Sequence, residues 1–226
     1  MDLVDTLRTT GAVREFRPDA VDDDVVFRIL DNARFAPSGG NRQGWHVVIV
    51  KDPDERRALR DLYLAGWYEY LAQRRAGLVP WAPVTDEEAE RRALEQVETA
   101  ATDPGAFAED LDEVPVLLVL LADLRVLAAV DRGFDRYTMA GGASIYPFAW
   151  SILLAARAEG LGGVITTVAI RREPEVKGLL GVPDDLVVAG VIALGRPITQ
   201  ARRLARRPVS EFATVDRFDG PPFSGG

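Results

Sequence analysis

This sequence predicts an α+β domain in which helices flank a mixed sheet of about four to five strands. Three apolar runs, which begin near residues 45, 115 and 186, are typical of buried strands, and segments with helical spacing separate them. The 226 residues allow one large domain or two small ones, and neither an internal repeat nor a linker divides them. We therefore predict a single domain over residues 1–218, followed by a flexible tail over residues 219–226.

The N-terminal part predicts two helices, a loop and a strand. A short helix near residues 3–8 is followed by a segment that Pro18 closes. The aspartates at 22–24 supply the cap and first-turn carboxylates of a second helix. Its apolar residues recur at helical spacing, namely Val26, Phe27, Ile29, Leu30 and Ala33. The apolar run 45–50 then reads as a buried strand.

The middle of the chain predicts a helical excursion over residues 61–110. One helix runs from Pro53 to about Gln73, with Pro53 in its first turn. The pattern Thr-Asp-Glu-Glu at residues 85–88 resembles a capping box and starts a further helix, which extends to about Ala101.

The second half of the chain alternates strands and helices. We predict strands over 114–122, 161–168 and 186–194, and helices over 139–159 and 173–181. The helix over 139–159 is apolar almost all round, so it is either central in the fold or packed against a second subunit.

Composition and charge exclude several classes of function. The net charge of −8 argues against a general nucleic-acid binder. Without Cys and with His46 as the single His, we expect no metal site, and we interpret His46 as structural. No apolar run reaches the roughly 18 residues of a membrane span. The acidic N-terminus lacks a signal pattern, so we expect a cytoplasmic protein without a membrane partner.

The loop over residues 36–45 is a candidate small-molecule site because it combines backbone freedom with polar donors. Its two glycines let a ligand approach the main chain. Asn41 and Gln43 each offer an amide donor and an acceptor, and Arg42 offers a fork of donors. A polar loop at the mouth of a strand is a common way to build such a site.

Two arginine clusters complete the candidate residues. The first contains Arg8, Thr9, Thr10 and Arg14, and the second contains Arg202, Arg203, Arg206 and Arg207. Either cluster could be a solvated basic face. Together with the loop, however, they suit a ligand that carries a phosphate and a hydrogen-bonding ring, since arginine pairs with phosphate through bidentate hydrogen bonds.

The usual signatures of protein-borne catalysis are missing from this sequence. It contains no P-loop motif, no GxGxxG after a strand and no GxSxG elbow. With one His and no Cys, a His-assisted nucleophile has little material. A borrowed cofactor is the natural alternative.

Four segments in order resemble motifs of the nitroreductase family of flavin enzymes. They are RTTGAVREF at residues 8–16, APSGGNRQGW at 36–45, GLGGVITT at 160–167 and GRP at 195–197. The Arg-rich tail around Pro208 extends the likeness, which covers nearly the whole chain outside the excursion.

The resemblance implies a nitroreductase-like α/β sandwich that forms an intertwined homodimer with FMN at the interface. It also implies hydride transfer from NADH or NADPH to FMN, and then transfer to a nitroaromatic, a quinone or a similar small acceptor in a ping-pong cycle. The same likeness leaves two alternatives, a non-catalytic flavin-binding or storage protein and a flavin-cleaving or dehalogenating specialist.

The resemblance assigns cofactor contacts to residues that match the motifs. Arg14 is expected near N1 and O2 of the flavin ring, and Arg206, with Arg8, near the phosphate. The remaining expected FMN contacts are Thr10, Pro37, Ser38, Gly39, Asn41, Gln43, Gly162, Gly163 and Val164. Where many members carry Arg and Ser, this chain has Gly11 and Ala12, so backbone amides or Arg8 must replace those contacts.

The aromatic residues of the excursion allow two interpretations. Trp67, Tyr68, Tyr70 and Trp81 either pack in a core or form a wall beside the acceptor substrate. No catalytic side chain is expected, because the hydride chemistry belongs to the flavin.

Overall fold

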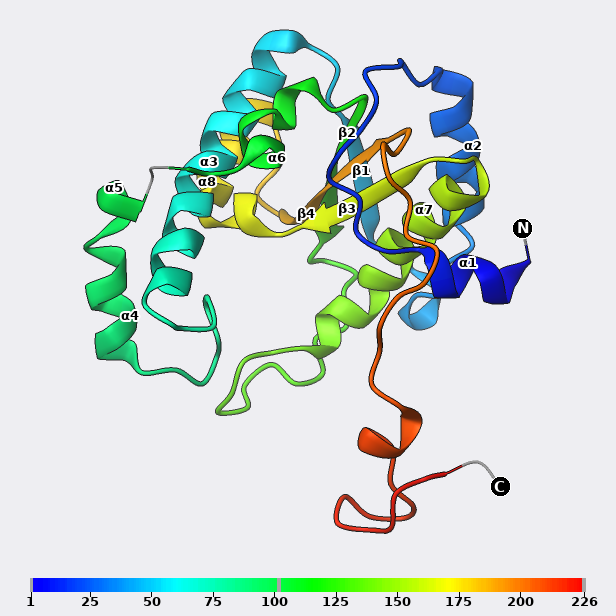
Figure 1. Cartoon of the computed structure of the whole chain (residues 1–226), viewed down its shortest axis with the longest axis vertical. Coiled ribbons are helices and arrows are strands. Elements are labelled where there is room, and N and C mark those ends of the chain that lie inside the picture. Colours follow the sequence, from blue (N-terminus) through cyan, green and yellow to red (C-terminus); the bar gives the residue numbers. More distant parts are fainter. Residues whose placement is uncertain (1, 101–102, 225–226) are drawn as a thin grey trace.

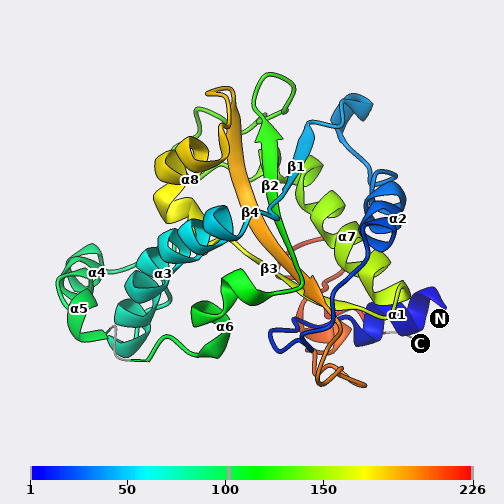
Figure 2. The same cartoon turned by 90° about the horizontal axis from the view of Figure 1, so that it is seen from above.

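Two layers of helices enclose one sheet in the computed structural model, which describes residues 2–100 and 103–224 (Figures 1 and 2). The sheet has the order β1-β2-β4-β3. Its strands are β1 (Trp45–Ile49), β2 (Val116–Asp123), β3 (Gly162–Thr166) and β4 (Leu186–Gly195). The expected strands are therefore present, and the α+β class is confirmed.

All three strand pairs in this sheet are antiparallel, so the predicted mixture of directions was wrong. Parallel neighbours need a crossover connection, and helices between the strands are compatible with one. Here the segments between consecutive strands hold several helical pieces, and the chain enters the next neighbouring strand from the opposite end. A parallel contact occurs as an isolated bridge between Ala12, which belongs to no strand, and Gly163 of β3.

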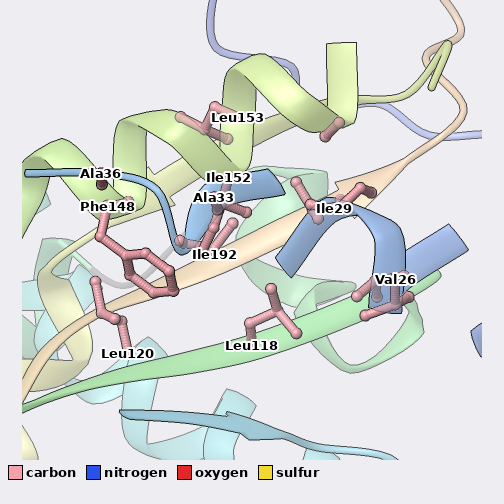
Figure 3. Close-up of a cluster of buried hydrophobic side chains, with 14 of the residues drawn as sticks. Val26, Ile29, Ala33, Ala36, Leu118, Leu120, Phe148, Ile152, Leu153 and Ile192 are labelled. Atoms are coloured by element: carbon pink, nitrogen blue, oxygen red, sulfur yellow. The ribbon is translucent and has the colours of Figure 1, made fainter. Parts of the chain in front are cut away.

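One face of the sheet is covered by α2 (Asp23–Ala33) and α7 (Tyr146–Ala158) (Figure 3). The buried stripe of α2 is Val26, Ile29 and Ala33. Phe27, which belongs to the same apolar pattern in the sequence, lies off this stripe and is 70% exposed. Helix α7 buries Phe148 and Ile152 against β2 and β4 but leaves other apolar side chains at the surface.

The other face is covered by α3 (Pro53–Arg75) and α8 (Glu173–Leu180), together with the 3₁₀ turn η4 (Val168–Arg172). Asp52 caps α3 by accepting hydrogen bonds from the backbone N–H groups of Asp54 and Glu55. Gly66 allows close approach, because a Cβ atom there would lie 2.8 Å from the Val168 carbonyl oxygen.

The excursion beyond α3 is more broken than its sequence pattern predicts. Its pieces are α4 (Glu87–Leu94), α5 (Val97–Ala100), α6 (Ala106–Glu109) and the 3₁₀ turn η2 (Leu111–Glu113). Asp86 caps α4 through the N–H groups of Glu88 and Ala89, and Thr85 precedes the cap. The expected end of this helix near Ala101 lies outside the described residues.

Strand β1 is an edge strand, which corrects the expectation of a buried one. Its residues are half-buried or exposed, and His46 is among the exposed ones. An edge strand pairs on one side only and leaves its other side open. Trp45 still anchors the strand, because its ring stacks on Phe148 with centroids 4.6 Å apart.

The N-terminal segment and the chain that follows β4 lie close together, and the C-terminal segment then extends away from the body of the molecule (Figure 1). Helix α1 (Leu3–Thr9) precedes a segment that runs beside the chain after β4, with a bridge between Phe16 and Pro197. Farther on, Thr214 bridges to Pro222, so part of the expected flexible tail turns back on the residues that precede it. Residues 225–226 lie outside the described residues, and the flexibility of 219–226 stays a prediction.

Candidate functional site

The loop between α2 and β1 has a strained backbone, and hydrogen bonds within the loop and to Ser144 stabilise it. The Gly39 N–H donates to Ser144 Oγ at 3.0 Å, and the Gln43 N–H donates to Ser38 Oγ at 2.9 Å. Asn41 and Gln43 have φ angles of 52° and 50°, a region that few non-glycine residues adopt. Such strain persists only where the surroundings hold it, and it often marks a binding site.

The exposed atoms of this loop are the ones that a ligand could use. Gly39, Gly40 and Asn41 are exposed, and Ser38 is half-buried. The Gln43 side chain donates to the Asn41 side chain at 3.2 Å, so the two amides form one polar unit. Arg42 lies over Gly40 with its side chain at the surface, which separates it from that unit.

The glycines of β3 serve the packing of this chain. The Val13 N–H donates to the Gly163 carbonyl at 2.9 Å, and a Cβ atom on Gly162 would lie 2.6 Å from Val13. A Cβ atom on Gly163 would lie 2.7 Å from the Ala193 carbonyl oxygen. Both glycines and Val164 are buried, so they place the segment before Arg14 against the edge of the sheet.

Arg14 emerges from that edge with its side chain exposed. It lines a cavity of about 490 Å³ together with Phe16, Phe107 and Pro115. The buried Tyr63 interacts electrostatically with Arg14. Burial raises the pKa of Tyr63, and Thr166 and Arg14 oppose this shift.

The residues around Thr9 and Thr10 join the N-terminal segment to the chain after β4. The buried Thr10 hydroxyl donates to the Thr6 carbonyl at 2.7 Å, which leaves its lone pairs, and not its proton, for a ligand. Gln200 donates to the Thr9 carbonyl at 2.9 Å. A Cβ atom on Gly11 would lie 2.9 Å from Leu204, so glycine here admits the tail.

Two residues near Thr9 escaped the sequence interpretation. Arg157 Nη2 donates to Thr9 Oγ1 at 3.4 Å, whereas its Nε atom is buried without a partner in the described part of the chain. Gln200 Oε1 is likewise buried and unpartnered there. The helical position of Arg157 was the only signal in the sequence, and it does not distinguish a buried arginine from a surface one.

The arginines of the two clusters are available to an anion. Within residues 2–100 and 103–224, none of Arg8, Arg14, Arg202, Arg203, Arg206 and Arg207 forms an ion pair. Arginines elsewhere in this acidic chain, such as Arg28 and Arg171, do find carboxylates. All six are exposed, and Arg206 donates only to the neighbouring Ala205 carbonyl among the described residues. This donor set fits a phosphate.

The single chain does not bring the loop and the arginines together. The loop leads into β1, while the segment before Arg14 bridges to β3, and these strands are the two opposite edges of the sheet. The donor set is therefore split into two halves, each built by its own contacts.

The excursion aromatics form a stack along α3. Trp67 stacks on Tyr70 with centroids 4.7 Å apart, and its Nε1–H donates to the Pro104 carbonyl at 2.7 Å. These contacts favour core packing for Trp67 and Tyr70. Tyr68 is half-buried on the same helix, whereas Trp81 lies in the following loop and lines a cavity.

The described residues contain neither a group of three His, Cys, Asp or Glu side chains that could hold a metal ion nor a helix suited to crossing a membrane. The groups that the two halves do offer are arginine, amide and backbone donors, which bind organic anions and rings.

Comparisons with known proteins show which family and which solved structures this chain is similar to. A family model described as "Nitroreductase family" matches residues 7–196. A Thermus thermophilus protein named NADH dehydrogenase is 30% identical over 199 residues, which are 88% of this chain and 88% of that protein. A Rhodospirillum rubrum 5,6-dimethylbenzimidazole synthase is 29% identical over 208 residues, with 87% and 86% of the chains covered. A solved structure of oxidised iodotyrosine deiodinase, bound to FMN and 3-iodo-L-tyrosine, aligns with a TM-score of 0.66 at 21% identity, over 96% of this chain and 100% of that one.

Proposed function

The chain belongs to the nitroreductase family, and from this premise we propose that it is an FMN-dependent oxidoreductase. In this proposal NADH or NADPH reduces the flavin, and a nitroaromatic, quinone or similar small molecule then reoxidises it. The observation that carries the proposal is the presence of two kinds of donor in the described residues: exposed arginines without ion pairs and, at the opposite edge of the sheet, a backbone-rich polar loop. Phosphate, ring and ribityl groups of FMN match these two kinds of donor.

FMN fits the residues of the two halves in complementary ways. The phosphate is assigned to Arg206 and Arg8. Thr10, whose hydroxyl proton is donated to the Thr6 carbonyl, is assigned to a ribityl hydroxyl, from which it would accept a hydrogen bond. The loop residues Ser38, Gly39, Asn41 and Gln43, next to Pro37, are assigned to the ring and the ribityl chain. Main-chain groups of β3, over Gly162, Gly163 and Val164, would border the ring, and the burial of these residues gives it a rigid support.

A homodimer would unite the two halves in this proposal. The loop of one subunit would meet the arginines of the other, since they occupy opposite edges of one sheet. Helix α7 supports a second subunit, because Tyr146 and Trp150 are 46% and 40% exposed on a helix whose opposite face, with Phe148 and Ile152, is buried. In the tail, Phe212 and Phe218 are exposed by 62% and 99% and offer further apolar surface.

When bound, FMN supplies a ring that can accept a hydride and pass reducing equivalents on. The chain's own contribution is electrostatic. Arg14 places a cation where negative charge develops on the reduced ring, and this favours the reduced state. Burial raises the pKa of the Tyr63 phenol still further above neutral pH, so this group brings no negative charge towards Arg14.

The visible spectrum of the purified protein tests this proposal. We expect a yellow protein that loses its colour when NADH or NADPH is added without oxygen and regains it with a quinone or nitroaromatic. Colourless protein that takes up no added FMN would refute the flavin assignment. Bound FMN that neither nicotinamide reduces would favour the storage alternative.

A second candidate function comes from the named relatives. One is a 5,6-dimethylbenzimidazole synthase, and a matching structure is an iodotyrosine deiodinase. Dehalogenation or flavin cleavage on the same scaffold is therefore the alternative to nitro or quinone reduction. Product analysis distinguishes them: release of halide from an iodinated phenol, or loss of FMN during aerobic turnover, would replace the first proposal.

A further inference from the structure

A cavity of about 450 Å³ lies between the loop after α3 and the turn that follows β3. Trp81 and Tyr137 supply its ring surfaces, and Thr167 and Arg171 come from the β3 side. Thr167 is the residue directly after β3 (Gly162–Thr166), the strand assigned to the flavin ring. The cavity therefore opens beside the proposed flavin site, at a place where an acceptor could reach it.

Trp81 is held in this wall by a strained backbone. Its φ angle is 51°, and the buried side chain of Gln73 accepts a hydrogen bond from its backbone N–H at 2.8 Å. For a bulky residue this conformation costs free energy and persists only where the surroundings impose it. The Trp81 Nε1–H is buried and has no partner among the described residues. Trp81 therefore combines a strained backbone with an unsatisfied ring donor beside the cavity.

Arg171 is fixed at the same cavity by an ion-pair cluster. The side chain of Glu69, on α3, is 11% exposed and accepts from Arg171 Nε at 2.8 Å and from Arg172 Nη2 at 2.9 Å. The Arg171 guanidinium also lies over the Trp81 ring, 5.5 Å from its centroid. Because the hydrogen bond to Glu69 uses Nε, the terminal nitrogens of Arg171 are left to present paired donors to a ligand.

The charges of the cavity restrict what it can hold. Glu69 bonds to two arginines, so the cluster keeps a net positive charge at Arg171. Glu87 and Glu90, in the first turn of α4, line the same cavity and would repel a second negative charge on the ligand. A single carboxylate on a flat ring can therefore be held here only by direct contact with Arg171.

We propose that this cavity is the acceptor subsite and that Arg171, positioned by Glu69, selects planar aromatic acceptors that carry one carboxylate. This inference rests on the proposed function, because the cavity is assigned to the acceptor through its place beside the flavin strand. Arg171 is the residue that contacts the ligand, and Glu69 is a positioning residue that acts through it.

A matched pair of variants tests the inference, since Arg171 and Arg172 share the same carboxylate but only Arg171 lines the cavity. The probes are 4-nitrobenzoate and 4-nitrobenzamide, which have similar shapes and differ in charge. Calorimetry of each probe with the oxidised holoenzyme, without nicotinamide, gives the affinity. Stopped-flow mixing of reduced enzyme with each probe gives the dependence of flavin reoxidation on acceptor concentration.

We expect Arg171→Gln to weaken 4-nitrobenzoate binding roughly 10- to 100-fold, as for loss of a charged hydrogen bond. Binding of 4-nitrobenzamide should change little, and Arg172→Gln should keep the preference for the carboxylate. Arg171→Lys should restore part of the preference, and Glu69→Gln should reduce it.

Each outcome separates the inference from the proposed function. Equal losses for Arg171→Gln and Arg172→Gln, or wild-type binding of the two probes with equal affinity, would overturn the subsite. Binding of 4-nitrobenzoate that depends on Arg171 without any reduction of the flavin by nicotinamide would leave the subsite standing and overturn the proposed oxidoreductase.

Discussion

At the scale of single residues, Asp131 shows how one buried carboxylate organises a loop. Its side chain accepts hydrogen bonds from the Met139 N–H at 2.7 Å and from Arg136 Nη1 at 2.9 Å. These bonds, the one from the Met139 backbone first, lower the pKa of Asp131 to about 2. The loop that it holds carries Tyr137, a wall of the cavity beside Trp81.

The depressed pKa gives a pH dependence with a definite sign. An unfolded Asp titrates near 3.9, so the stability from Asp131 is complete above about pH 4 and is lost as pH falls towards about 2. We expect Asp131→Asn to lower the melting temperature at pH 7. The difference from wild type should shrink below pH 4 in thermal melts. A difference that stays constant between pH 7 and pH 3 would contradict this account.

A second residue-scale prediction concerns the phosphate. Arg206→Ala should weaken FMN binding by about 1.5–3 kcal/mol, because a charged hydrogen bond is lost. The control is Arg217→Ala, whose guanidinium in the same tail is paired with Asp219. Fluorescence titration of apoprotein with FMN measures both. Equal affinities for the two variants would show that Arg206 belongs to a solvated face.

The third concerns the flavin ring. Arg14→Ala should lower the reduction potential of bound FMN, because the cation that stabilises the reduced ring is removed. Arg17→Ala, a change in the same exposed segment, should leave the potential near that of wild type. Equilibrium titration with a reference dye gives the potential, and an unchanged value for Arg14→Ala would remove it from the ring edge.

At the scale of elements, the contact between α3 and η4 depends on a missing side chain. A Cβ atom on Gly66 would lie 2.8 Å from the Val168 carbonyl oxygen and 3.1 Å from Arg171 Cβ. Because the obstructing atom belongs to the backbone, α3 and η4 would have to move apart to accommodate a Cβ atom at residue 66. This contact also sets the position of Arg171 relative to the cavity.

Gly66→Ala should therefore destabilise the protein by about 1–3 kcal/mol, as overpacking does. The matched control is Gly178→Ala in α8, where a Cβ atom would meet nothing within 4 Å. That change should stabilise the helix by about 0.5–1 kcal/mol. Urea unfolding measures both, and a Gly66→Ala variant as stable as Gly178→Ala would show that the helices move apart without cost.

At the scale of the whole molecule, the placement of the two half-sites makes a prediction about assembly. If FMN is shared between subunits, Arg14→Ala removes one half and Asn41→Val, which disfavours the φ of 52°, disturbs the other. Each variant alone should bind FMN weakly. After subunit exchange, about one quarter of the sites should be intact, because about half of the dimers are mixed and each mixed dimer rebuilds one of its two sites.

Flavin binding of the mixed sample measures this recovery. The control is a mixture of Arg14→Ala with a second arginine variant, Arg206→Ala, which rebuilds no site if both arginines come from one subunit. Recovery that is no greater than in the control would place the loop and the arginines in the same subunit.

Much of the fold could be predicted, because its signals are local. Continuous apolar runs located β2 and β4, and Pro53 and Gly181 marked helix ends through their own backbone geometry. The exposure of His46 and Phe27 could not be predicted, because an apolar neighbourhood in sequence does not say which side of an element is covered.

The sequence by itself determined the family of this protein and the residue types of its candidate site, since motifs and arginine clusters are written in residue order. Only the tertiary structure decided how these pieces are distributed. It set the loop and Arg14 at opposite edges of one antiparallel sheet, joined Arg157 and Gln200 to Thr9, and brought Glu69 to Arg171. These contacts link residues far apart in the chain, and they follow from how strands pair and layers pack, which no local pattern encodes.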